Sequence, residues 1–409
     1  MLLISSALAT QGELAPRDNR DLAERLERKA RRVARELKKH HLPHGTIFDP
    51  VYAGPDSDEV VRYTHAGDSA IWTGHYLAAA AFEYAVTGSR KAKSKVRKAV
   101  AAIRVLLEVT GNETLARGAV PASSPWIEAI SVGEAHQRVF EGTHNGVDYL
   151  WAGTTSRDQY SGVMFGLGFA WELVPVDGIR AEIHEIVTRL VDYLRNGAWT
   201  VQNPDGSIST TFLARPEQML AFLQIARRIH PERFDQPYGE VRNAFGHLVD
   251  LPISAEATDL HNSYFKFNLD AINLVHLVRL EEPGEYFDEY RHAYDILRNT
   301  IGSHENAHFN MIDYVIAGPD AARDRETKRL LKQWLLRPRR NTTVDLTGTY
   351  PACGDNLACN VIPVAERVPT DFLWQRDPFV LSGGGGGDVG AAGIDLLLPY
   401  WMSRYYGVL

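Results

Sequence analysis

Helical segments in this chain come in pairs, and in each pair a nearly uncharged segment is followed by an amphipathic one. Residues 68–88 read DSAIWTGHYLAAAAFEYAVTG, whereas the next segment, SRKAKSKVRKAVAAIRVLLEVTG at 89–111, is rich in Lys and Arg. A helix that is apolar on all sides is buried, and a helix with one apolar face lies at the surface. The alternation therefore predicts an inner layer of helices covered by an outer layer.

Six buried segments are predicted, beginning near residues 68, 158, 214, 262, 305 and 393. The first five are each followed by an amphipathic partner, and the amphipathic segment near residue 18 is expected to pack against the sixth. This pattern predicts an all-α fold, an (α/α)6 toroid, formed by residues 17–409 as a single domain. The long connections at 111–156 and 337–392 are expected to cap it. Strand patterns are limited to short runs such as GSISTTFL at 206–213.

The N-terminal residues and the cysteines bear on the cellular compartment. A short apolar run ends in Ala7-Leu8-Ala9, so residues 1–16 are expected to be the remnant of an export signal or a disordered tail. Cys353 and Cys359 have a spacing that suits a small disulfide loop, and two buried thiols fit it equally well. Together these features slightly favour a secreted or periplasmic protein over a cytoplasmic one.

Charge and hydropathy argue against two classes of partner. The net charge is -7, and the basic run at 27–41, ERKARRVARELKKHH, is interleaved with Glu on a predicted helix, so no nucleic-acid partner is expected. No apolar run reaches the roughly 18 residues that a membrane span needs. The sequence leaves the oligomeric state undetermined.

Two aspartates begin neighbouring inner helices. The inner helices of a toroid run in one direction, so the residues that begin them are expected to meet at one rim. Glycoside hydrolysis requires two carboxyl groups across a sugar-binding cleft, and Asp68 and Asp158 are predicted to be that pair, with Glu217 in reserve. Either aspartate taken alone fits a helix cap better, because Asp at a helix start is favoured by capping and by the helix dipole.

Capping does not account for the residues around the two aspartates. Trp72, His75 and Tyr76 lie on or beside the helix face of Asp68. The second inner segment contains GVMFGLG at 162–168, where each Gly costs about 1 kcal/mol relative to Ala. These glycines indicate either close packing of two helices or room for a ligand.

Aromatic and polar side chains near the same rim are predicted to bind the substrate, a small molecule or an oligosaccharide. Aromatic rings stack on sugar faces, and His, Asn and Tyr offer the directional donors and acceptors that hydroxyl groups need. The predicted substrate-binding residues are Trp72, His75, Tyr76, Trp151, Arg157, Gln159, Arg215, Glu217, Asn262, Tyr264, His308, Asn310, Trp374, Arg376, Asp377 and Gly384.

No cofactor and no metal are expected. His304 and His308 stand four residues apart, a spacing that is able to bind a metal, but hydrogen bonding to a polyhydroxylated ligand fits this Asn-rich and His-rich segment better. The five glycines Gly383–Gly387 lack the following Gly-Lys-Ser/Thr of a nucleotide-binding loop. They predict a loop whose backbone passes close to the rim.

Several segments occur in an order that resembles a known family. They are residues 68–88, TTSRDQYSGVMFGLGFAWELV at 154–174, NAHFNMIDYVIAG at 306–318, FLWQRDPFVLSGGGGG at 372–387 and DLLLPYWMSRYYG at 395–407. The series is similar to a bacterial family of helical toroid domains that are often joined to β-propeller modules and largely lack assigned chemistry. The resemblance runs from about residue 60 to the end. It implies a toroid that acts alone or with another partner, since no propeller is present.

Within that resemblance, five single positions and the glycine run match residues that the relatives share. The positions are Asp68, Trp72, Asp158, His261 and Asn310, and the run is Gly383–Gly387. Where the relatives tend to have an acidic residue after the second aspartate, this chain has Gln159, which weakens any mechanism that needs a carboxylate there. The predicted fold is also similar to that of many glycoside hydrolases and polysaccharide lyases.

Four functions follow from these features. The leading one is a glycoside hydrolase that uses Asp68 and Asp158. A polysaccharide lyase would use Tyr160 or Tyr264 with His261 for proton transfer, and Asn262 or Arg215 to neutralise a uronate. A terpenoid-type cyclase or dehydratase would use Asp68 as a Brønsted acid. The fourth is a glycan-binding toroid without catalysis.

Overall fold

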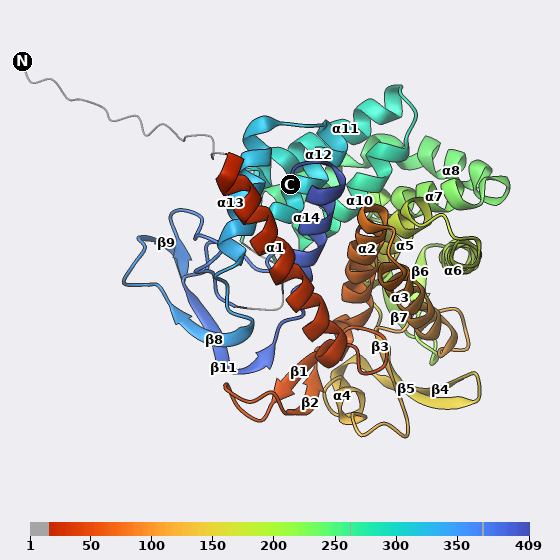
Figure 1. The fold of residues 1–409 in the computed structure, drawn as a ribbon. Coiled ribbons are helices and arrows are strands. Elements are labelled where there is room, and N and C mark those ends of the chain that lie inside the picture. Colours follow the sequence, from red (N-terminus) through yellow and green to blue (C-terminus); the bar gives the residue numbers. More distant parts are fainter. Residues whose placement is uncertain (1–15, 262, 370–371) are drawn as a thin grey trace, which may run out of the picture.

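The computed structural model describes residues 16–261, 263–369 and 372–409, and most of these residues lie in helices (Figure 1). The α-helices are α1 (Pro16–Glu36), α2 (Ser69–Thr87), α3 (Arg90–Glu108), α4 (Glu128–Ser131), α5 (Arg157–Leu173), α6 (Asp177–Asn196), α7 (Pro216–Ile229), α8 (Pro231–Phe245), α9 (Asp250–Ala257), α10 (Lys266–Leu280), α11 (Glu285–Ile301), α12 (Ala307–Ala317), α13 (Ala321–Trp334) and α14 (Ile394–Tyr405). The segment 1–15, which holds the predicted signal remnant, lies outside the described residues.

Six of these helices contact one another in a closed cyclic order. α2 packs against α5, α5 against α7, α7 against α10, α10 against α12, α12 against α14, and α14 returns to α2. Every residue from Ser69 to Phe82 of α2 is buried, and so is every residue from Gln159 to Ala170 of α5. These six helices are the segments that the sequence predicted to be buried, because their nearly uncharged surfaces need cover on all sides.

The amphipathic helices pack around these six. α3 contacts α2, α6 contacts α5 and α7, α8 contacts α7, α11 contacts α10, and α13 contacts α12. α1 packs against α14 and α13, so the first described helix lies beside the last one (Figure 1). The expected contact of the segment near residue 18 with the sixth inner helix is therefore present.

The fold is mostly helical, but it also contains short strands, so the all-α prediction was too narrow. The strands are β1 (Asp49–Tyr52), β2 (Val60–Thr64), β3 (Gly118–Pro121), β4 (Val139–His144), β5 (Val147–Ala152), β6 (Thr200–Gln202), β7 (Ile208–Thr211), β8 (Arg340–Asp345), β9 (Ala352–Gly354), β10 (Leu357–Ala358) and β11 (Ser382–Gly390). They form antiparallel sheets in the orders β2-β1-β11-β8, β3-β5-β4, β6-β7 and β10-β9. Short strands of these sheets thus lie within both long connections.

The five consecutive glycines lie in a strand, so the prediction of a loop was wrong. Gly383–Gly387 belong to β11, which pairs with β1 on one side and β8 on the other. Gly384 has a φ of +95°, and a Cβ there would stand 2.1 Å from the carbonyl oxygen of Thr342. Glycine is required at this position because only glycine tolerates both the left-handed backbone and the close approach of β8.

Cys353 and Cys359 form a disulfide with a Cα to Cα distance of 4.8 Å. The bond closes the β9–β10 hairpin. Of the two alternatives left open by the sequence, the disulfide loop is the one present. Structural disulfides persist mainly in oxidising compartments, so the bond supports the predicted secreted or periplasmic location, which stays a prediction.

Glycines bring the backbones of α2 and α5 into direct contact. A Cβ on Gly74 would stand 1.9 Å from the carbonyl oxygen of Gly162, and a Cβ on Gly166 would stand 2.2 Å from that of Gly74. A Cβ on Gly168 would stand 2.7 Å from the ring of His276 in α10. The glycines of α5 therefore serve close helix packing, and the alternative of ligand space is not supported at these positions.

Substituting one of these glycines is expected to separate the two helices. Gly166→Ala should lower the free energy of unfolding by about 1–3 kcal/mol, because overpacking outweighs the roughly 1 kcal/mol that Ala gains over Gly inside a helix. Gly239→Ala in α8 is the matched control, since no heavy atom lies within 4 Å of the added Cβ. The control should gain up to about 1 kcal/mol. Urea unfolding measures both, and a Gly166→Ala protein as stable as the control would contradict the packing account.

Candidate functional site

A small cavity at the N-terminal ends of α2, α5 and α10 is lined by both predicted catalytic carboxylates. Its walls are formed by Asp68, Ile71, Trp72, Asp158, Phe265, Asn268, Leu269, Trp374 and Gln375, which we refer to as the acid-pair pocket. The volume is about 10 Å³, which is space for roughly one water molecule. The structure therefore brings together four predicted site residues, namely the two aspartates and two tryptophans.

A single amide holds the two carboxylates. Nε2 of Gln159 donates to Oδ1 of Asp68 at 3.2 Å and to Oδ2 of Asp158 at 3.3 Å. Its Oε1 accepts a hydrogen bond from the backbone N–H of Ile71 at 3.0 Å, so the buried amide has a fixed orientation. Gln159 thus supplies a donor shared by the acid pair.

A buried arginine, Arg117, is linked to both carboxylates, to Asp68 directly and to Asp158 through Ser156. Nη2 of Arg117 lies 3.3 Å from Oδ1 of Asp68, and its Nη1 donates to Oγ of Ser156 at 2.6 Å. Ser156 in turn donates to Asp158. Nε of Arg117 donates to the carbonyl oxygen of Gly67 at 2.8 Å, which fixes the guanidinium. One cation therefore reaches the first carboxylate directly and the second through a hydroxyl group.

The capping explanation for these aspartates is not supported. The side chain of Asp68 makes no capping hydrogen bond to α2, although the residue stands at the N-cap position. The N-cap residue of α5 is Ser156, and Asp158 lies inside the first turn. Both carboxylates instead form hydrogen bonds with side chains at the α2–α5 interface. A side chain that only caps a helix would bond to the backbone N–H groups of the first turn.

Two aromatic side chains of one loop, Phe372 and Trp374, cover the acid-pair pocket, and we refer to them as the aromatic plug. Phe372 and Trp374 stack with ring centroids 5.3 Å apart, and both are almost fully buried although they lie in a loop. Measured between ring centroids, Trp72 lies 3.8 Å from Phe372, and His75 stacks on Trp374 at 5.2 Å. The ring of His308 lies 4.6 Å from that of Trp374. The plug therefore places aromatic and imidazole rings from α2, α12 and the loop in one cluster.

The two histidines of this cluster are neutral at pH 7. Burial lowers the pKa of His75 to about 4, against hydrogen bonds with Ile71 and Asn268 that raise it. Nδ1 of His75 donates to the carbonyl oxygen of Ile71 at 2.8 Å, and Asn268 donates to Nε2 at 3.3 Å. Burial and the neighbouring His75 place the pKa of His308 well below its usual value. Neither ring nitrogen of His308 has a hydrogen-bond partner among the described residues.

The reserve carboxylate, Glu217, belongs to a separate acidic cluster. Arg215 is hydrogen-bonded to Glu256 and lies 3.7 Å from Oε1 of Glu217. Burial raises the pKa of Glu217 to about 7, and Arg215 opposes this shift. Burial, with the nearby Glu256 and Glu217, raises the pKa of Asp270 well above its usual value. Arg157, a predicted binding residue, adjoins this cluster, and none of these side chains lines the acid-pair pocket.

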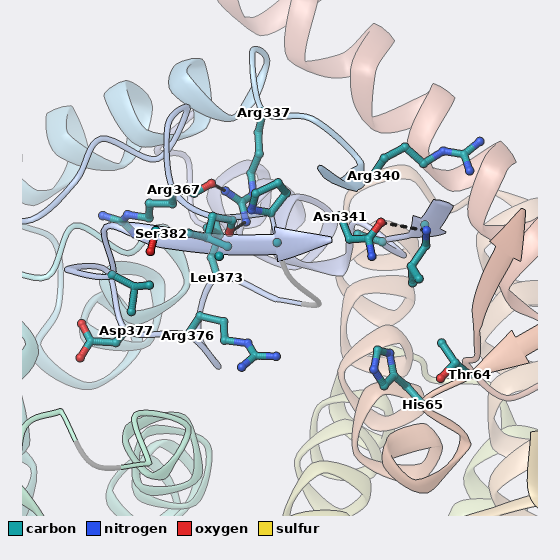
Figure 2. A pocket seen from close by; sticks show the side chains of 18 of the residues that line it. Thr64, His65, Arg337, Arg340, Asn341, Arg367, Leu373, Arg376, Asp377 and Ser382 are labelled. Carbon is teal, nitrogen blue, oxygen red and sulfur yellow. Dashed lines mark hydrogen bonds between the residues drawn. The ribbon is translucent and has the colours of Figure 1, made fainter. Parts of the chain in front are cut away.

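A second and larger cavity lies between the β2-β1-β11-β8 sheet and the segment 373–380 (Figure 2). Its volume is about 450 Å³, and its walls include five arginines, so we refer to it as the arginine cavity. Three predicted binding residues, Arg376, Asp377 and Gly384, line this cavity rather than the acid-pair pocket.

Several predicted residues serve the surrounding structure. Trp151 lies in β5, is fully buried and packs on Phe140. Tyr160 is fully buried, and its hydroxyl accepts a hydrogen bond from the backbone N–H of Leu115 at 3.1 Å. Tyr76 is also buried. The structure thus places Trp151, Tyr160 and Tyr76 where they have no access to a ligand at the acid pair.

The remaining predicted residues lie at other points of the helix ends. Nδ1 of His261 lies 2.6 Å from Oδ2 of Asp377. The hydroxyl of buried Tyr264 lies 3.1 Å from Nδ1 of His304. Asn310 donates to Glu326 of α13 at 2.9 Å, which ties an inner helix to an outer one. Asn262 lies outside the described residues.

Residues 304–308 read HENAH and match the His-Glu-x-x-His pattern, in which two histidines on one helix face bind zinc. Here α12 begins at Ala307, so His304 and Glu305 precede the helix. Glu305 pairs with Arg329 at 2.9 Å, His304 contacts Tyr264, and His308 faces the aromatic plug. The three side chains of the pattern therefore do not converge.

Sequence reasoning missed Arg117, Ser156 and Asn268. Arg117 stands in the otherwise apolar run LARGAVPA at 115–122, and an isolated arginine in such a run signals a buried charge with a specific partner. Ser156 and Asn268 carry no comparable signal, because polar residues at helix starts are common.

No protein-family model and no curated protein matches the chain. The described residues contain no group of three or more His, Cys, Asp or Glu that is arranged to hold a metal ion. Among the helices of the described ranges, none is long and apolar enough to cross a membrane.

The buried carboxyl of Glu217 is expected to make stability depend on pH. Its folded pKa of about 7 exceeds the ordinary value of 4.5, so the folded state retains a proton that the unfolded state has lost. The free energy of unfolding should fall by about 3 kcal/mol through this group as the pH rises from 4.5 to 7.5.

Urea unfolding of wild type and Glu217→Gln across this pH range measures the effect. The difference in unfolding free energy between the two proteins should change by about 3 kcal/mol, because the amide does not titrate. Glu240→Gln, an exposed substitution in α8, is the matched control. A pH-independent difference for Glu217→Gln would contradict the assignment.

Proposed function

We propose that this protein is a glycoside hydrolase whose catalytic carboxylates are Asp68 and Asp158. The single observation that carries the proposal is the sharing of one amide donor, Gln159, by two carboxylates that line the same pocket. Two carboxylates this close repel each other, so such a pair destabilises the fold unless the protein uses it. Glycoside hydrolysis needs a pair of this kind. Trp72 and Trp374, on the walls of the same pocket, offer rings for a sugar face.

The proposal includes the (α/α)6 toroid as the fold. Its support is the closed cyclic order of contacts through α2, α5, α7, α10, α12 and α14, with one amphipathic helix outside each of them. The N-terminal ends of α2, α5 and α10 meet at the acid-pair pocket, as expected for inner helices that run in one direction. Fold alone does not specify the reaction, so the function rests on the carboxylates.

The separation of the carboxylates favours retention of configuration. Two hydrogen bonds to one nitrogen limit the distance between Oδ1 of Asp68 and Oδ2 of Asp158 to at most about 6.5 Å, whereas inverting enzymes place their carboxyl groups about 6.5–9.5 Å apart and retaining enzymes about 5 Å. In this proposal Asp68, beside the Arg117 cation, is the nucleophile. Asp158, which has the Ser156 hydroxyl as its neighbour, protonates the leaving oxygen and later activates water.

A sugar does not fit a cavity of about 10 Å³, so the proposal requires the loop that carries Trp374 and Gln375 to move. Trp374 and Gln375 form the wall of the pocket that comes from a loop, while the other walls are helices or helix ends. Displacement of this loop would also uncover His75 and His308, the two neutral imidazoles that are in contact with Trp374. His308, whose two ring nitrogens have no hydrogen-bond partner among the described residues, would then offer hydrogen bonds to hydroxyl groups. Both ring nitrogens of His75 are already bonded, to Ile71 and Asn268.

The apolar walls of the acid-pair pocket favour one second candidate. Ile71, Trp72, Phe265, Leu269 and Trp374 surround the carboxylates, which suits an Asp acid that protonates an alkene or allylic alcohol of a terpenoid. The lyase has less support, because Tyr160 and Tyr264 are buried with their hydroxyls bonded to other groups. The acid pair itself favours the hydrolase over both.

Removing either carboxylate is expected to abolish turnover. Asp68→Asn and Asp158→Asn should each lower kcat by at least about 10³-fold on any glycan that the wild type cleaves, because nucleophile and acid act in the same reaction. Their affinity for that glycan should stay within a few-fold. Asp148→Asn, an exposed substitution in β5, is the control. Full activity of both variants would overturn the proposal, and cyclisation or dehydration of a member of a terpenoid panel, with no glycan cleaved, would favour the second candidate.

Gln159→Glu tests the role of the shared amide at nearly constant volume. A third carboxylate beside Asp68 and Asp158 adds like-charge repulsion and removes the shared donor, so the acidic limb of the pH profile of kcat/KM should move to higher pH. The shift should be at least about one pH unit. An unchanged profile would show that Gln159 does not act on the catalytic pair.

A further inference from the structure

The arginine cavity concentrates positive charge in a protein whose net charge is -7. Arg62, Arg337, Arg340, Arg367 and Arg376 line it. Asp377 is the carboxylate among its described lining residues, and Asp377 is engaged by His261. Its volume of about 450 Å³ is that of a small-molecule site. A concave surface of one sign raises the local concentration of ligands of the opposite sign.

Two of the arginines are fixed parts of the wall. Arg337 donates to the carbonyl oxygens of Arg367 at 2.9 Å and Val368 at 3.0 Å. Arg367 donates to the carbonyl oxygens of Ile362 at 2.7 Å and His304 at 3.2 Å. Both are almost fully buried. Burial lowers the pKa of Arg367 to about 10, so its guanidinium stays charged at pH 7.

The other arginines reach the cavity from different elements. Arg340 in β8 lies over the ring of Tyr52, and its Nη1 has no hydrogen-bond partner among the described residues. Arg62 in β2 and Arg376 in the loop are exposed. Figure 2 shows Arg376 extending from its loop toward the side of the cavity where His65 lies. Arginine is the side chain best suited to bind a carboxylate, because its planar fork presents two parallel donors.

His65 adds an oriented imidazole to this cavity. Its backbone has a φ of +56°, a conformation that few non-glycine residues adopt. Its Nδ1 lies 3.0 Å from Oδ2 of Asp49, which is buried and also faces His41 at 3.4 Å. Burial alone would raise the pKa of Asp49, but hydrogen bonds from the two histidines hold it below the usual value. An ionised Asp49 therefore fixes the ring at the cavity wall.

Two segments of the chain each contribute residues to both the arginine cavity and the acid-pair pocket. In the loop, Leu373, Arg376 and Asp377 line the arginine cavity, while Trp374 and Gln375 line the acid-pair pocket. In the segment that leads into α2, His65 lines the first and Asp68 the second. Each of these two segments therefore contributes residues to both cavities.

We propose that the arginine cavity binds the carboxylate-bearing sugar of an acidic glycan. The glycan part rests on the proposed hydrolase function, whereas the binding of an oxyanion on a sugar-sized ligand does not. Sulfate or phosphate esters of sugars share the same chemistry, and the experiment distinguishes these sources.

Titration calorimetry of the full chain tests the proposal. The ligands are galacturonate, glucuronate and mannuronate trimers, the carboxyl-reduced form of each trimer, a sulfated neutral trimer and inorganic phosphate. At least one uronate trimer should bind, and Arg62→Gln with Arg376→Gln should weaken it at least tenfold, because each loses a charged donor. Arg97→Gln, exposed on α3 and away from the cavity walls, should leave the affinity unchanged. Unchanged urea midpoints show that the variants fold.

Each result supports or overturns the assignment. Equal binding of a carboxyl-reduced trimer would overturn recognition of the anion. Binding of the sulfated trimer or of phosphate without any uronate trimer would overturn the carboxylate assignment, and no binding of any ligand would overturn the site. If binding is found but no glycan is cleaved, the hydrolase proposal fails and the oxyanion site stands.

Discussion

The backbones of α2 and α5 touch where Gly74 faces Gly162 and Gly166, and the candidate site depends on that contact. Side chains at these positions would separate the helices by the width of a methyl group or more. Gln159 spans the same interface, since its oxygen binds the backbone of α2 and its nitrogen binds a carboxylate from each helix. The distance between the two acids is therefore a property of the helix packing, not of flexible side chains.

Electrostatics supplies the second constraint. Two carboxylates on adjacent helix starts repel each other, and the fold compensates with donors and a cation at the interface. Arg117 comes from the connection before β3, and its hydrogen bonds tie that connection to the starts of α2 and α5. Helix N-termini add a favourable field for negative charge. The carboxylates are stabilised by groups behind them, while the aromatic plug covers the side from which a substrate would approach.

Much of the helical arrangement could be predicted from the sequence, and most of the strands could not, although β7 lies within the predicted run at 206–213. The six nearly uncharged segments are the six helices that contact one another in cyclic order. They could be recognised because a helix that is buried on all sides carries few charged residues. The strands are short, and β11 is mostly glycine, so they lack the alternation that identifies a sheet. For the site, Asp68 and Asp158 were predicted from their places at helix starts. Arg117 was not, because its role depends on a long-range contact with residues about 50 positions away. Trp151 and Tyr160 were expected in the pocket but lie in the core, because the sequence around an aromatic residue does not show whether its ring is buried in the core or lines a pocket.

The crystal structure of Asp158→Asn soaked with a uronate trimer tests the central claim most directly, because removing the acid leaves the bound glycan intact. The account predicts that the loop carrying Trp374 is displaced, that a carboxylate of the glycan meets Arg62 and Arg376, and that a glycosidic oxygen lies between residues 68 and 158. A trimer bound elsewhere, with the acid-pair pocket still closed by Trp374, would contradict it.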